Sequence, residues 1–86
     1  MRVRIWTVDG QVTRFTVQYE TMINGKSFPV ARYDTAHGFA HRDLLDRNGK
    51  LREQKVPIDN QASLDDALQF SVQDLRQHWR GYRRDF

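Results

Sequence analysis

The segment from Arg32 to Asp43 concentrates side chains that can do acid–base chemistry. Its twelve residues include two of the chain's three histidines, two carboxylates and two arginines. An imidazole oriented by a carboxylate is a general acid or base suited to near-neutral pH, and a nearby guanidinium can stabilise an oxyanion or hold a phosphate. Together these residue types are typical of metal-independent cleavage of RNA, in which a base activates the 2′-OH, an acid protonates the leaving oxygen and a cation holds the phosphate.

A tight turn centred on Ala36 and His37 would bring the two halves of this segment together as neighbouring strands. The strand pairs that follow from such a turn are Asp34 with Phe39 and Arg32 with His41. Alternate residues of a strand share a face, so the charged groups are expected on one side of the sheet, pointing into solvent. The candidate catalytic residues are His41, Asp34, Asp43, Arg32 and, at the tip of the turn, His37.

Other interpretations of the same residues stay open. Alternating arginine and aspartate on adjacent strands commonly form cross-strand ion pairs, and such a cluster can also bind a ligand without catalysis. If the C-terminal helix covered it, the cluster would be a buried polar network. His37 and His41 have the spacing of zinc ligands on a helix, but Gly38 and the turn argue against a helix here. We expect no metal and no cofactor.

A second candidate surface combines arginine with tryptophan. Trp6 falls on the strand face opposite Ile5, alongside Arg2 and Arg4. An exposed tryptophan between arginines can stack on a nucleic-acid base, although packing against a partner subunit or under a loop is the alternative. The C-terminal arginines can form a phosphate-binding end or complement the helix dipole. The candidate binding residues are Arg2, Arg4, Trp6, Arg80, Arg83 and Arg84.

Hydrophobic alternation predicts five β-strands, over residues 2–7, 13–19, 26–35, 39–46 and 50–58. Pro29 has no backbone N–H, so we expect it at an edge, a strand start or a bulge. The dipeptides that indicate turns between strands are Asp9-Gly10, Asn24-Gly25 and Asn48-Gly49.

The apolar pattern also predicts strand register. A three-residue loop, Val8 to Gly10, pairs Val3 with Phe15 and keeps the apolar side chains of both strands on one face. A three-residue loop ending at residue 49 likewise pairs Leu45 with Leu51. Both hairpins are therefore expected to have loops of odd length.

From residue 63 the apolar period changes to steps of three and four, which predicts one long helix. Ser63 is the expected N-cap, with Asp66 completing a carboxylate variant of the capping box. We expect His78 at the helix surface. The apolar stripe consists of Leu64, Leu68, Val72, Leu75, Trp79, Tyr82 and Phe86. The predicted fold class is α+β: an antiparallel five-stranded β-meander with one long C-terminal α-helix packed on one face, in a single domain over residues 1–86.

Length and composition exclude several classes of protein. A chain of 86 residues fits one small domain. Its net charge is +3, and positive and negative residues are interspersed along the sequence. The absence of cysteine excludes disulfides, thiolate nucleophiles and cysteine-based metal sites. There is no apolar run of about 18 residues and no signal-peptide pattern, so we expect a soluble, cytoplasmic protein that does not span a membrane.

Residues 32–41 read RYDTAHGFAH. They resemble a group of small uncharacterised bacterial and archaeal proteins that carry an R-[YW]-D-N-A-H/P pattern, a following histidine and a final amphipathic helix. More remotely, the stretch is similar to the toxin component of TumE-type toxin–antitoxin pairs. The residues that match are Arg32, Tyr33, Asp34, Ala36 and His41. Thr35 stands where the pattern has asparagine, and Gly38 stands where the toxins have a second histidine.

The sequence therefore supports hypotheses from different classes. The first is a toxin-like or RNA-processing, metal-independent nuclease, whose partners would be RNA and an antitoxin-like protein. The second is a noncatalytic nucleic-acid- or protein-binding module, and a homodimeric structural module is the third. Whether the chain is an enzyme stays open from the residues alone.

Overall fold

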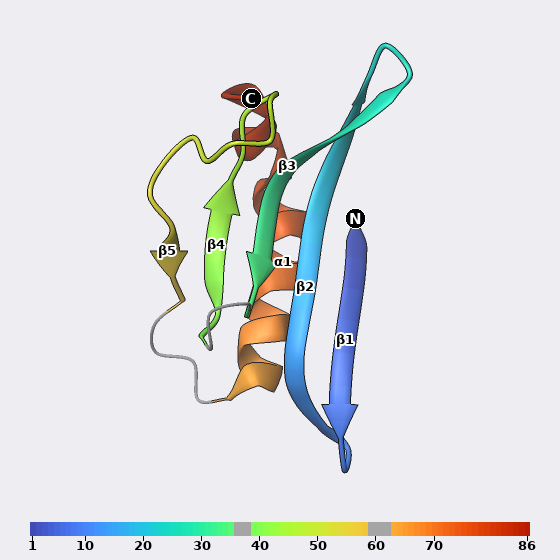
Figure 1. Ribbon diagram of the computed structural model, residues 1–86, viewed down its shortest axis with the longest axis vertical. Coiled ribbons are helices and arrows are strands. Elements are labelled where there is room, and N and C mark those ends of the chain that lie inside the picture. Colours follow the sequence, from blue (N-terminus) through green and yellow to red (C-terminus); the bar gives the residue numbers. More distant parts are fainter. Residues whose placement is uncertain (36–38, 59–62) are drawn as a thin grey trace.

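The computed structural model describes residues 1–35, 39–58 and 63–86. Within these ranges it confirms the predicted α+β architecture: five antiparallel strands follow one another across one sheet, and a helix packs on one face (Figure 1). The elements are β1 (Arg2–Val8), β2 (Gln11–Ile23), β3 (Lys26–Asp34), β4 (His41–Leu44), β5 (Val56–Pro57) and α1 (Leu64–Arg84).

The β1–β2 hairpin has a different loop from the predicted one but keeps the predicted face. Asp9-Gly10 is a two-residue turn with positive φ at both positions, 50° and 77°, as a type I′ turn requires. Thr13 is then the extra residue of a bulge in β2. This bulge restores the apolar register, because without it the short turn would place apolar side chains opposite polar ones. Val3 therefore pairs with Val17, and the predicted pairing with Phe15 is wrong.

The β2–β3 hairpin confirms both of its sequence signals. Asn24-Gly25 forms the turn, with φ values of 52° and 79°. Pro29 lies beside a bulge whose extra residue is Val30, which is where a residue without an N–H is tolerated. The bulge sets the register of the rest of β3, and this register places Arg32 and Asp34 on the face opposite the buried Tyr33.

The last two strands are shorter than predicted. The observed spans are His41–Leu44 and Val56–Pro57, in place of 39–46 and 50–58. The predicted three-residue loop between them is confirmed, because Leu45 and Leu51 form a bridge. Beyond Leu51 the chain bends, and the Arg52 guanidinium donates a hydrogen bond to the Tyr82 carbonyl at 3.1 Å. This side-chain contact with α1 replaces the expected continuation of the strand.

The helix begins where the sequence predicts. The Ser63 hydroxyl accepts a hydrogen bond from the backbone N–H of Asp66 at 3.2 Å, which confirms the N-cap. The most buried positions of α1 are Ala67, Ser71 and Leu75, at 1% exposure or less. The face of α1 that contacts the sheet is therefore displaced from the predicted stripe. Small side chains at the centre of the contact let the helix approach the sheet closely, and larger side chains flank it. The flanking, half-buried residues include Leu64, Leu68, Val72 and Tyr82.

The helix covers only part of the sheet. It packs on β2 and β3, where Phe15, Val17 and Tyr33 are at most 2% exposed. β1 lies beyond the helix at the edge of the sheet (Figure 1), and every residue of β1 is exposed. The other face of the sheet is not covered by α1 (Figure 1).

Asp74 and Tyr82 of α1 connect the helix to the sheet through Tyr33 of β3 and Arg42 of β4. The hydroxyl groups of Tyr33 and Tyr82 donate to the same Asp74 oxygen, at 2.6 and 2.5 Å. The Arg42 guanidinium donates to the Tyr82 hydroxyl at 3.3 Å. Burial, together with the hydrogen bonds to Asp74, raises the pKa of both tyrosines, because the ionised phenolate would be desolvated and repelled.

The raised tyrosine pKa values predict that the free energy of unfolding falls above about pH 10. At that pH tyrosines ionise in the unfolded chain, whereas folded Tyr33 and Tyr82 stay neutral, so their contribution is complete below pH 10 and lost as pH rises. The urea midpoint measured by circular dichroism should therefore fall less between pH 8 and pH 11 in a Tyr33→Phe/Tyr82→Phe variant than in the wild type. Equal falls in the two proteins would contradict the prediction.

Candidate functional site

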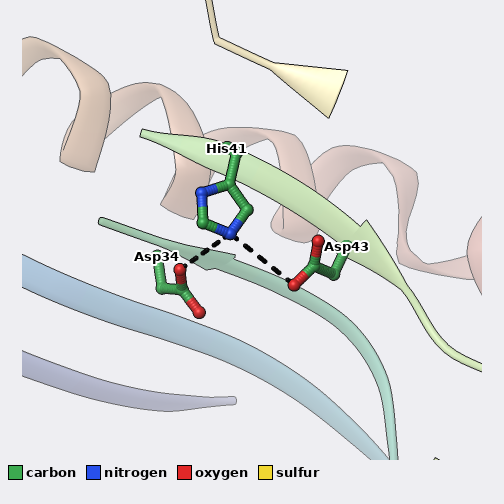
Figure 2. A group of neighbouring side chains, drawn as sticks. All are labelled: Asp34, His41 and Asp43. Atoms are coloured by element: carbon green, nitrogen blue, oxygen red, sulfur yellow. Dashed lines mark ion pairs between the residues drawn. The ribbon is translucent and has the colours of Figure 1, made fainter. Parts of the chain in front are cut away.

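The strands β3 and β4 bring the predicted cluster together. Asp34 pairs with His41, and Arg32 pairs with Asp43. Figure 2 shows Asp34, His41 and Asp43 converging on the side of the sheet away from α1. The predicted pairing of Asp34 with Phe39 is wrong by two residues, because the connection is longer than a two-residue turn. A shift of two residues leaves every side chain on its predicted face.

His41 contacts a polar group through each ring nitrogen. Nε2 lies 2.9 Å from Asp34 Oδ1 and 3.7 Å from Asp43 Oδ2 (Figure 2). Nδ1 lies 3.3 Å from the carbonyl oxygen of Phe39. Both nitrogens thus have an oxygen acceptor nearby, and a protonated ring can donate to two of them at once.

Two cations balance the carboxylates beside His41. The Lys55 ammonium donates to both oxygens of Asp43 at 3.0 Å. The Arg32 guanidinium approaches Asp34 at 3.4 Å and Asp43 at 3.7 Å. We refer to Arg32, Asp34, His41, Asp43 and Lys55 as the histidine network.

The expectation that the cluster faces solvent is wrong for its central members. His41 is 0% exposed and Asp43 2%, whereas the side chains of Asp34 and Arg32 are 15% and 35% exposed. The Phe39 ring, 5.4 Å from that of His41, and Lys55 lie against the histidine. A general acid or base must come within hydrogen-bond reach of the reacting proton, so His41 in this position acts on a ligand only through Asp34. His37, the remaining candidate catalytic residue, lies outside the described residues.

The histidine network also contains a set of potential metal ligands that differs from the one weighed in the sequence. Donor atoms of Asp34, His41 and Asp43 all lie within 4.8 Å of one another. The Lys55 ammonium, however, occupies both Asp43 oxygens, and Arg32 contacts both carboxylates. A divalent cation would have to displace Lys55, so the arrangement fits an ion-pair network better than a metal centre.

A groove runs over the face of β1, β2 and β3 that α1 leaves open. It has a volume of about 420 Å³. Among the described residues it is lined by Arg2, Arg4, Trp6, Arg14, Thr16, Gln18, Arg32 and Asp34. We call it the basic groove, because four arginines face a single carboxylate. It contains three of the predicted binding residues, and it ends at Arg32 and Asp34 of the histidine network.

Trp6 and Arg14 form a flat surface at one end of the basic groove. They pair across β1 and β2, and the Arg14 guanidinium carbon lies 4.0 Å from the centroid of the Trp6 ring, within the range of a cation–π contact. Trp6 is 37% exposed. Sequence reasoning missed Arg14, since its place opposite Trp6 depends on the bulge in β2. It also missed Lys55, whose position depends on the bend after Leu51.

The C-terminal arginines do not join this groove. Arg83 donates to the Thr21 hydroxyl at 3.1 Å, and the Arg80 guanidinium lies 4.7 Å from the Trp79 ring centroid. These contacts place them with α1, on the opposite side of the sheet from Trp6. Arg84 is exposed in the last turn of the helix. The predicted binding residues therefore divide between two surfaces. His78 is exposed, as predicted.

The fold and the site define an α+β protein with an open, arginine-lined sheet face. The chain belongs to the family described as Domain of unknown function (DUF7718), which matches residues 1–86. No curated protein and no solved structure matched the chain. Among the described residues, no helix is both long and apolar enough to cross a membrane.

The histidine network predicts that Lys55 is more important for stability than an ordinary surface lysine. Lys55→Met leaves the buried Asp43 carboxylate without its nearest cation, which should lower the free energy of unfolding by about 1–3 kcal/mol. Lys26→Met is the matched control, because Lys26 is exposed at the start of β3. Chemical denaturation of the two variants measures the difference, and equal losses would show that the network contributes nothing specific.

Proposed function

We propose that the basic groove binds single-stranded RNA without cleaving it. The observation that carries the proposal is the composition of the groove, in which the described residues include four arginines and a tryptophan against one carboxylate. Arginines that neutralise phosphates release condensed counterions, and this release drives polyanion binding. The residues that line the groove belong to β1, β2 and β3, and α1 leaves one face of these strands uncovered (Figure 1).

Each kind of side chain in the groove matches part of a nucleotide. Guanidinium groups bind phosphate through paired hydrogen bonds. Trp6 and the Arg14 guanidinium present flat surfaces on which an unstacked base can stack. Thr16 and Gln18 offer hydrogen-bond donors and acceptors to bases and to ribose 2′-OH groups. A single strand exposes all of these groups together, whereas a duplex hides its base faces.

Toxin-like cleavage of RNA is the second candidate function, and one contact supports it. Asp34 lines the groove and lies 2.9 Å from the His41 imidazole, so a carboxylate at the end of the groove has a histidine behind it. The burial of His41 weighs against this candidate, because its side chain is only 1% exposed and a catalytic histidine must reach the reacting proton. An antitoxin-like protein partner belongs to this second candidate alone.

The binding proposal predicts a salt dependence that individual groove arginines control. Replacing an arginine that contacts a phosphate should reduce the slope of log affinity against log salt by about 0.7 for a single strand. We expect this reduction for Arg4→Ala when binding of a fluorescently labelled RNA oligonucleotide is followed by anisotropy. Arg84→Ala removes the same charge from the far end of α1 and should leave the slope unchanged.

Two outcomes would contradict the proposed function. Equal slopes for Arg4→Ala and Arg84→Ala would show that net charge, and not the groove, attracts the RNA. If wild-type protein cut the oligonucleotide on a denaturing gel in the presence of EDTA, and Asp34→Asn did not, the groove would be a nuclease site.

The two tryptophans lie on opposite sides of the sheet and report separately on binding. Trp79 packs edge-on against Tyr19, with ring centroids 5.7 Å apart, whereas Trp6 lines the groove. We expect RNA to quench the fluorescence of Trp79→Phe, which retains Trp6, and not that of Trp6→Leu. Trp6→Leu should also bind roughly 5- to 100-fold more weakly, the cost of one lost base stack. Undiminished quenching in Trp6→Leu would place the RNA elsewhere.

A further inference from the structure

The strand β1 presents apolar side chains that α1 does not cover. Val3 and Ile5 pair with the buried Val17 and Phe15, so they lie on the helix face of the sheet. They are nevertheless 43% and 48% exposed, because the helix packs on β2 and β3 and β1 lies beyond it (Figure 1). Within the described residues β1 pairs only with β2, so its outer edge offers unpaired backbone groups.

Exposed apolar side chains gather on this edge. Among the described residues ten large apolar side chains are exposed, and five of them belong to residues 1–8. Those five are Met1, Val3, Ile5, Trp6 and Val8. A groove of about 340 Å³, lined mainly by apolar groups of Tyr19, Leu75 and Trp79, adjoins Met1. An apolar edge strand without inward charges or proline is a template for pairing with another strand.

We propose that this edge binds a second copy of the chain, with β1 pairing antiparallel to β1 of the partner around a two-fold axis at Ile5. The axis is perpendicular to the sheet, so the two five-stranded sheets become one and both helices lie on the same face. Strand pairing across a sheet edge needs no rearrangement of either copy. This inference does not depend on the proposed RNA binding.

The register centred on Ile5 is the one that the strand favours. Residue 5 is the midpoint of Arg2–Val8, so this register alone pairs all seven residues of β1. It places Ile5 opposite its own copy, and Val3 opposite the partner's Thr7, all on the apolar face. A register centred on Arg4 would instead place two guanidinium groups directly opposite each other, which is unfavourable.

The same register is also complementary on the open face of the sheet. It places Arg4 opposite the partner's Trp6, so that a cation faces an aromatic ring rather than another cation. It also joins the two basic grooves across the two-fold axis. Each groove carries four arginines against one carboxylate, so we expect dimerisation to strengthen as added salt screens their repulsion.

Single cysteines test the register directly, because the chain has no cysteine of its own. Directly opposed residues of antiparallel strands have Cβ atoms about 4.5–5.5 Å apart, close enough for a disulfide after small adjustments. Ile5→Cys should therefore form a covalent dimer on oxidation. Val3→Cys should not, because its copy lies four residues along the strand, about 13 Å away. A mixture of Val3→Cys and Thr7→Cys should cross-link.

Sedimentation equilibrium tests the association without cross-linking. The wild type should be a dimer, and Ile5→Lys, which sets two like charges face to face, should be a monomer at the same concentration. Met22→Lys is the matched control, since Met22 is 63% exposed on β2 and lies away from β1. A monomeric wild type, an unaltered Ile5→Lys dimer, or equal cross-linking of Ile5→Cys and Val3→Cys would each overturn the proposal. If circular dichroism shows Ile5→Lys unfolded, the cysteine variants decide.

Discussion

A single amphipathic helix can bury only one face of a sheet, and this constraint organises the whole molecule. The apolar side of α1 packs on β2 and β3. The opposite face has no second apolar layer within the described residues. The polar and charged side chains on it must therefore either find partners or stay exposed to water. The structure does both, by pairing opposite charges in buried positions near β4 and by keeping the arginines of β1 and the start of β2 exposed.

These two solutions meet at β3. Arg32 and Asp34 line the basic groove and also contact the buried part of the histidine network. A buried polar group without a partner destabilises the fold, whereas a buried network in which every group has a partner is stable. His41 contacts two carboxylates and lies near Lys55. The network therefore holds β4 against β3 and fixes the orientation of the two residues that end the groove. His41 is therefore a positioning residue for Arg32 and Asp34, and the ligand binds to the arginines of the groove.

Local sequence signals predicted the elements of the fold but not the details of their register. Alternating apolar residues, the Asn24-Gly25 turn and the Ser63 N-cap depend on neighbours in the chain, and all three are confirmed. The bulge at Thr13 is not a local signal of this kind. It arises because the two-residue turn alone would pair apolar residues of β1 with polar residues of β2, and the bulge corrects that pairing. The sequence could predict that the cluster shares one face of the sheet, because an error of two residues in the strand pairing leaves each side chain on the same face. It could not predict the burial of His41, because that burial depends on where a distant bend places Lys55.

The most direct test of the central claim is an NMR titration of the uniformly ¹⁵N-labelled protein with a short single-stranded RNA. The account predicts that backbone amide shifts concentrate in β1, the first half of β2 and the end of β3, with α1 unaffected. Shifts centred on α1 and its C-terminal arginines, or no shifts at low salt, would contradict the claim that the open sheet face is the binding surface.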